Sequence, residues 1–376
     1  MTTTAPAVRD RLGWVDAVRG ACVLAVVLFH VTAWHVLPLD LPPLADRTWS
    51  VVNSYLGSLR MPLLLAVSGL LASRRILAGW RSSAAAERAA SSYYLYLVWL
   101  AVYAVLYAVL DHPWLPHSID GAGEAALEVV WPQTPLWYVF ALAVYVVVLT
   151  SLSRVPPAVV LGGLAVVSVV FQVGDWDLGL AAKVPELAFF FAVGVHGRAR
   201  LGDFAERLDH RRGAGALAAV LASVAAGRVL PSDGVLHALL VLVRGVSFLL
   251  LGVAVVVVLV RWRPAARAGS WIGQQTLPVY VLHVPLLLVL VSVLGPDPSP
   301  RLGGLLSNTV VALGYPLVLT AVLVALTLLL HRLLLRLHAR ALFGMPESWT
   351  LAVRRAHGRL ARRTSEPQPA VRLPAD

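Results

Sequence analysis

The segment LHALLVLVRGVSFLLLGVAVVVVLV, residues 236–260, is almost entirely apolar and contains a single arginine, Arg244. It is longer than the stretch of about 20 apolar residues that an α-helix needs to cross a bilayer. Similar segments recur along the chain, in which 59% of the 376 residues are hydrophobic and only 14% are charged. This composition excludes an ordinary soluble domain and predicts an all-α, polytopic bundle of transmembrane helices.

Apolar runs of this kind predict about ten spans. They cover residues 15–37, 51–73, 91–110, 136–153, 156–173, 183–198, 213–230, 236–260, 272–294 and 308–332. We assign residues 1–345 to one transmembrane domain. Residues 346–376 are rich in Arg, Pro and Ala, and we expect a basic cytoplasmic tail that is disordered or rests on anionic lipid.

The net charge of +11 would suit a nucleic-acid-binding protein, but its distribution points to membrane lipid instead. If the N-terminus is cytoplasmic, the cytoplasmic segments hold most of the arginines, among them Arg74, Arg75, Arg81, Arg88, Arg154, Arg198, Arg200, Arg261 and Arg263. The opposite loops hold acidic residues, among them Asp40, Asp46, Asp111, Asp120 and Glu124. This positive-inside pattern predicts a multi-pass inner (plasma) membrane protein with both termini in the cytoplasm and the 111–135 loop outside.

Ionisable side chains at bilayer depth are costly and usually functional, and in the first span Asp16, Arg19 and His30 stand out. Arg19 and His30 are eleven positions apart, which is close to three helical turns, so both project from one face about 16 Å apart along the axis. Asp16 lies three residues before Arg19 and can pair with it. Arg19 could instead be an anchor that reaches lipid phosphates. His30 lies past the middle of the span, and we predict a functional role for it.

Three further ionisable residues stand out inside predicted spans: Arg60, Arg244 and His283. These groups must meet each other, bound anions or water within the bundle. Buried arginines and histidines with almost no carboxylate suit an anionic ligand, such as a CoA phosphate, or a developing oxyanion. A proton pump would be expected to carry more intramembrane Asp or Glu.

Motifs for other chemistries are absent from the sequence. It has no GxxxxGK[ST], GxGxxG, HExxH or GxSxG pattern. His30 and His35 are five positions apart and point in different directions, so we expect no metal site. Cys22 is interpreted as a small core residue, Ser68 and Gly69 as a close contact between helices, and His112 and His117 as solvated loop residues.

Five segments, spread in order over the predicted membrane domain, resemble the acyltransferase 3 family. They are WVDAVRG at 14–20 followed by VVLFH at 26–30, RMPL at 60–63 followed by SG at 68–69, PLWYV at 135–139, FFFAVG at 189–194 and TLPVYVLH at 276–283. In the first, an arginine precedes a histidine by eleven positions, as in the family. In the second, Leu64, Leu65 and Ala66 stand where the family usually has aromatic residues.

The resemblance implies an acyltransferase that moves groups other than amino-acyl groups. The family transfers an acyl group, commonly acetyl from acetyl-CoA, to a hydroxyl of a surface polysaccharide, glycolipid or macrolide-type metabolite. Acyl-CoA would be a co-substrate, and no bound cofactor is expected. The chemistry fits, because a thioester has a good leaving group and the enzyme must mainly position and deprotonate a hydroxyl and stabilise the oxyanion.

In this interpretation the catalytic residues are His30 and Arg19, with Asp16 supporting Arg19. His30 would act as the general base or form a transient acyl-histidine, and Arg19 would bind the donor. Acceptor binding or charge stabilisation would fall to Arg60, Arg244 and His283. The main alternative is a transporter or flippase for a glycolipid or small anion, and a third possibility is a structural or assembly factor.

Overall fold

The computed structural model describes residues 13–110, 115–119, 121–174, 176–295 and 300–365. Within these ranges the chain forms fifteen α-helices and no strand, so the all-α prediction is confirmed. Eight helices are long and apolar enough to cross a membrane. They are α1 (Gly13–Val31, continued by a π-helical turn at Thr32–Val36), α2 (Pro43–Leu77), α3 (Ala84–Leu110), α7 (Lys183–His196, preceded by a 3-10 turn at Gly179–Ala182), α9 (His210–Val229), α10 (Gly234–Leu259), α12 (Thr276–Leu294) and α14 (Thr309–Arg336).

Two more helices, α5 (Trp137–Ser151) and α6 (Pro157–Val173), are apolar but shorter. Together with the eight long helices they account for the ten predicted runs, although length alone supports only eight as full spans. The other helices are α4 (Ala122–Glu128), α8 (Arg198–Glu206), α11 (Arg263–Gln274), α13 (Pro300–Leu306) and α15 (Glu347–Ser365). The predicted run 272–294 begins inside α11, because the break between α11 and α12 falls at Gln275.

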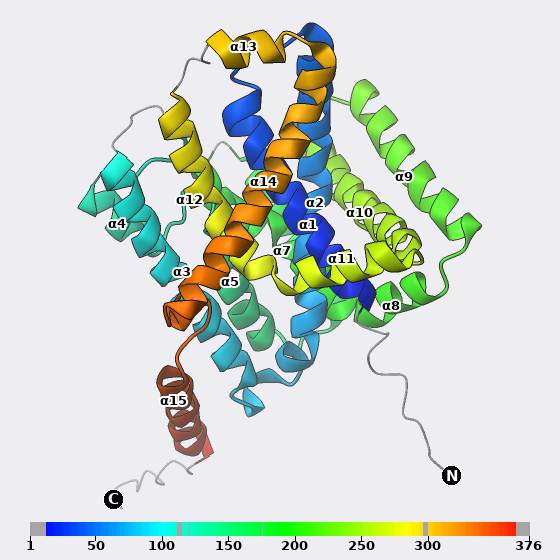
Figure 1. Cartoon of the computed structure of the whole chain (residues 1–376). Coiled ribbons are helices and arrows are strands. Elements are labelled where there is room, and N and C mark those ends of the chain that lie inside the picture. The colour runs from blue at the N-terminus through cyan, green and yellow to red at the C-terminus, as the bar shows by residue number, and fades with distance from the viewer. Residues whose placement is uncertain (1–12, 111–114, 120, 175, 296–299, 366–376) are drawn as a thin grey trace, which may run out of the picture.

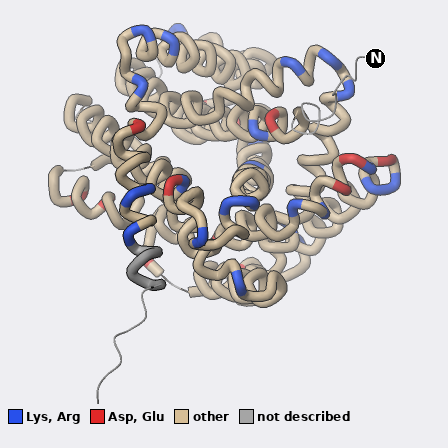
Figure 2. Tube along the Cα trace, turned by 90° about the horizontal axis from the view of Figure 1, so that it is seen from below, with Lys and Arg blue, Asp and Glu red and all other residues tan. Residues whose placement is uncertain are grey.

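The helical bundle has two ends, and the chain runs back and forth between them (Figure 1). The beginning of α1 lies at one end with α8, α11 and α15, whereas α13 lies at the other. We call these the inner end and the outer end, after the orientation predicted from the arginines. Viewed from the inner end, most of the charged segments along the chain are basic (Figure 2).

Glycine allows a close helix crossing between α2 and α7. A Cβ atom added to Gly69 would overlap the carbonyl oxygen of Phe191, and one added to Gly194 would overlap that of Ala66. The two backbones therefore touch directly, which small residues permit in membrane helices. This confirms the predicted close helix contact at Gly69. Ser68 beside it shares a hydrogen bond of 2.8 Å with the hydroxyl of Tyr138.

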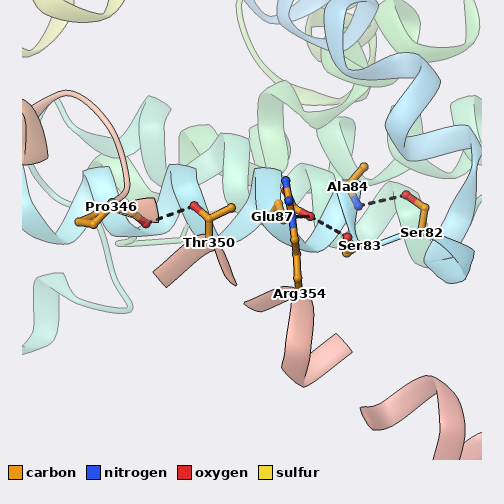
Figure 3. A network of polar contacts seen from close by, with 7 residues as sticks. All are labelled: Ser82, Ser83, Ala84, Glu87, Pro346, Thr350 and Arg354. Carbon is orange, nitrogen blue, oxygen red and sulfur yellow. Dashed lines mark hydrogen bonds and ion pairs between the residues drawn. The ribbon is translucent and has the colours of Figure 1, made fainter. Parts of the chain in front are cut away.

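The C-terminal segment differs from the expected disordered tail, because Glu347–Ser365 form helix α15. The guanidinium of Arg354 binds Glu87 through two contacts, Nε to Oε1 at 2.8 Å and Nη2 to Oε2 at 3.0 Å. Glu87 also accepts a hydrogen bond from Ser83 (Figure 3). Residues 347–365 are therefore helical, and their resting on anionic lipid stays a prediction. The remainder of the predicted tail lies outside the described residues.

The orientation of the bundle gives a first testable prediction. Arginines concentrate on alternate segments, so we expect the inner end to face the cytoplasm. Asp120, in the predicted outer loop, lies outside the described residues, so the first fusion site is placed nearby in α4. Reporter domains fused after Gly123 and after Ser365 should report opposite sides of the membrane. The same side for both fusions would overturn the predicted orientation.

Candidate functional site

The ionisable residues of α1 lie on one helical face at two depths. Near its inner end, Nη1 of Arg19 lies 3.4 Å from Oδ1 of Asp16, and the two side chains are 28% and 26% exposed. This confirms that the two residues pair. Arg88, in the first turns of α3, and Tyr138 of α5 also interact electrostatically with Arg19. A second arginine thus lies within electrostatic range of Arg19, and the sequence analysis counted it only as a positive-inside residue.

Toward the outer end, the structure brings His30 of α1 and His283 of α12 into contact. Nδ1 of His30 lies 3.1 Å from Nε2 of His283, and the ring centroids are 5.0 Å apart. Each ring also meets a carbonyl of its own helix, with Nδ1 of His30 at 2.9 Å from Val26 O and Nδ1 of His283 at 3.0 Å from Val279 O. The His283 side chain is almost completely buried, with 1% exposure.

Local breaks in regular helix geometry flank both histidines. The π-helical turn Thr32–Val36 follows His30 almost directly, and π-turns within helices are frequent at functional sites. Pro285 lies two residues after His283 and has no N–H to give to the carbonyl of Val281. The hydroxyl of Tyr103 donates to this carbonyl at 3.3 Å instead.

His30 lies in the wall of a cavity of about 650 Å³ that occupies the outer half of the bundle. Aromatic rings of Phe29, Trp34, Trp137 and Tyr280 form much of this wall. The polar lining includes the following side chains: Ser54, Ser58, Arg60, His117, Gln172, Lys183, Glu186 and His237. His283 does not line the cavity, so within the histidine pair only His30 can touch a molecule bound there.

Arg60 lies in the same wall and is held by an aromatic ring. Its guanidinium carbon is 3.3 Å from the centroid of the Phe29 ring, which is a cation–π contact. Its Nη1 is buried and has no hydrogen-bond partner in the described part of the chain. The positive charge of Arg60 therefore lies over the ring of Phe29, which precedes His30 in the chain. Stabilisation of an oxyanion would require a cation in such a position.

The structure separates Arg244 from this group. Its Nη2 donates to the carbonyl of Ser223 in α9 at 3.4 Å, and a Cβ on Gly227 would overlap this nitrogen. Arg244 is absent from the cavity wall. The residue thus lies between α9 and α10, and the expectation that it binds the acceptor has no support in the cavity.

Several cavity residues escaped the sequence analysis. His117 was interpreted as a solvated loop residue, but its ring lies 5.8 Å from that of Trp34 and lines the cavity. Lys183 and Glu186 form an ion pair of 2.6 Å at the beginning of α7. His237 belongs to the run 236–260, so it could have been found as a second ionisable residue there. Ser54 and Ser58 lie within α2 and Gln172 within α6, where uncharged polar residues gave no such signal.

The buried carboxyl of Glu128 stabilises the loop that leads into the cavity wall. Glu128 of α4, outside the spans, accepts a hydrogen bond from the backbone N–H of Gln133 at 2.9 Å. Burial raises the pKa of this carboxyl above its usual value. The loop that it holds leads into Pro135 and Trp137, and Tyr280 donates its hydroxyl hydrogen to the carbonyl of Pro135. Two helices of the cavity wall are thereby joined. Among the described residues, no three His, Cys, Asp or Glu side chains could bind a metal ion together.

Comparisons with known proteins give a family and one relative. A family model described as an acyltransferase domain matches residues 12–332. The inner membrane protein YcfT of Escherichia coli (strain K12) is 25% identical over 193 residues, which cover 47% of this chain and 54% of that protein. The match thus spans about half the length of the relative. No solved structure matches the chain significantly.

Proposed function

The chain belongs to the acyltransferase 3 family, whose model covers most of its length, and from this we propose that it moves an acetyl group from acetyl-CoA to a hydroxyl. The acceptor class is a glycan, a glycolipid or a macrolide-type metabolite. The observation that carries the proposal is the position of His30, which lines a large cavity beside the cation of Arg60.

His30 is the general base in this reaction. A neutral imidazole in the cavity wall can remove the proton from an acceptor hydroxyl while the hydroxyl oxygen attacks the thioester carbonyl. The developing oxyanion needs a preorganised cation, and the position of Arg60 in the cavity wall supports that role. The leaving thiolate then takes this proton from the imidazolium and departs as the free thiol. No covalent enzyme intermediate is needed.

Donor and acceptor approach from opposite ends of α1. Acyl-CoA carries phosphates, and the arginines at the inner end, Arg19 and Arg88, are suited to bind them. His30 lies about 16 Å farther along the helix, and the long pantetheine arm of CoA would bridge that separation. The acceptor occupies the outer cavity, where aromatic walls and mixed polar groups suit a sugar ring or a similar polyol.

Thiol release tests the proposal directly. Purified protein is mixed with acetyl-CoA, with methyl glucoside or water alone as the hydroxyl acceptor, and the free thiol of CoA is followed with a thiol reagent. We expect release that depends on the protein and increases with the glucoside. A protein that binds glycolipid or small anions and moves them across vesicles without releasing thiol would be a transporter, and the proposal would fail.

Arg19 gives a second prediction. Arg19→Ala should raise KM for acetyl-CoA by about tenfold to hundredfold, because a hydrogen bond to a charged group is worth about 1.5–3 kcal/mol. Arg19→Lys should restore part of the affinity, since lysine keeps the charge but loses the bidentate geometry. Arg154→Ala, an exposed arginine between α5 and α6, is the matched control and should leave KM unchanged. An unchanged KM for Arg19→Ala would remove the residue from the donor site.

A further inference from the structure

The contacts of His283 determine which of its ring nitrogens carries the proton. A neutral imidazole has one N–H donor and one lone-pair acceptor. Nδ1 of His283 faces the carbonyl oxygen of Val279 at 3.0 Å, and a carbonyl can only accept. Nδ1 therefore carries the hydrogen. Nε2 of His283 is left with the lone pair, and this lone pair faces His30 at 3.1 Å.

The hydrogen-bond partners of His30 determine its tautomer in the same way. Its Nδ1 has two neighbours, the carbonyl oxygen of Val26 at 2.9 Å and Nε2 of His283 at 3.1 Å. Both neighbours are acceptors, so Nδ1 of His30 must be the donor to each. The lone pair of His30 is then on Nε2, which has no hydrogen-bond partner in the described part of the chain. The reverse arrangement would turn two lone pairs toward carbonyl oxygens.

We infer that His283 is a positioning residue that locks His30 in the Nδ1–H tautomer, so that Nε2 of His30 takes the proton of the acceptor. The inference rests on the proposed function. The acceptor O–H bond breaks as its proton moves to Nε2, the O–C bond to the acyl carbon forms, and the C–S bond breaks. The proton on Nε2 then passes to the thiolate, which leaves as free CoA thiol. Nδ1 keeps its hydrogen throughout.

A neutral partner suits this depth in the membrane. A carboxylate behind His30 would be a second buried charge with a large cost of desolvation. The lone pair of His283 accepts from the same nitrogen at no such cost. His283 itself is held by the carbonyl of Val279 and by burial, so together with the carbonyl of Val26 it imposes one orientation on the His30 ring.

Two substitutions at position 283 test the inference with the full-length protein and the acetyl-CoA and methyl glucoside assay. His283→Leu fills the site but has no acceptor, and we expect kcat to fall about 10²-fold with KM for both substrates unchanged, because His283 does not line the cavity. His283→Gln can bring its amide oxygen close to the position of Nε2, and kcat should stay within tenfold of the native value. His35→Leu is the control: His35 is also buried and bonds Tyr315 at 2.8 Å away from the cavity, and kcat should hold.

The outcomes separate this inference from the proposed function. A His283→Leu protein with native kcat, a raised KM with native kcat, or a Gln variant as slow as the Leu variant would each overturn the positioning role. If His30→Ala is inactive in the same assay while His283→Leu is fully active, only the positioning role fails. If His30→Ala is fully active, the proposed mechanism fails together with it.

Discussion

His30→Ala is expected to abolish acyl transfer, with kcat at least 10³-fold below that of the native protein. General base catalysis commonly contributes 10²–10⁴-fold, and no other described histidine in the cavity wall is held by a second histidine in the way that His30 is. The protein should still fold, because His30 borders the cavity and its removal only enlarges that space. Thiol release from acetyl-CoA at matched amounts of folded protein measures the effect.

Cys22→Ala is the matched control for this experiment. Cys22 lies in the same helix and is buried among apolar side chains, with 2% exposure. The substitution tests general damage to α1 and should leave kcat nearly unchanged per folded molecule. A His30→Ala protein that retains near-native transfer would contradict both the catalytic assignment and the inheritance of the family mechanism at this position.

Gly194→Ala is expected to prevent stable folding. The added methyl group would overlap the carbonyl oxygen of Ala66, which belongs to the backbone of α2 and has no rotamer to escape into. Helices α2 and α7 must then separate, and overpacking of this kind costs about 3 kcal/mol or more. These helices carry Arg60, Lys183 and Glu186 of the cavity wall. We therefore expect loss of the folded protein from detergent extracts, measured as the yield and thermal midpoint of the monodisperse fraction.

Gly162→Ala provides the comparison. Gly162 lies in α6, is exposed, and a Cβ there would meet no atom within 4 Å. Alanine is the better helix former, by about 1 kcal/mol, so this variant should be as stable as the native protein or slightly more so. Equal yields for Gly194→Ala and Gly162→Ala would show that the α2–α7 crossing tolerates separation.

The sequence predicted the helices and the local contacts well, because those depend on composition and helical spacing. The ten runs reappear as eight long and two short helices. Asp16 and Arg19 pair as their separation of three positions requires, and Gly69 makes a close contact. Boundaries differ where local chemistry overrides hydropathy, as at Gln275, where α11 ends before α12 begins.

The sequence alone could not predict which distant helices contact each other. It identified His30 and His283 as buried ionisable groups, but 253 positions separate them, and no periodicity shows that two helices turn these residues toward each other. Arg244 was equally prominent in the sequence, yet the rotation of α10 turns it toward α9. His117 is in a loop, and only the fold shows that this loop reaches Trp34.

The shortness of α5 and α6 also acts on the surrounding lipid. With 15 and 17 residues, they measure about 22 Å and 26 Å, less than the bilayer hydrocarbon of about 30 Å. Trp137, the first residue of α5, and Gln172, in the last turn of α6, both line the cavity, so these helices end at the level of His30. Only Val160 and Ser168 of α6 are buried, so we expect lipid beside this helix to thin to avoid hydrophobic mismatch. A membrane-anchored acceptor would therefore meet His30 in a depression of the bilayer surface, with its head group still hydrated.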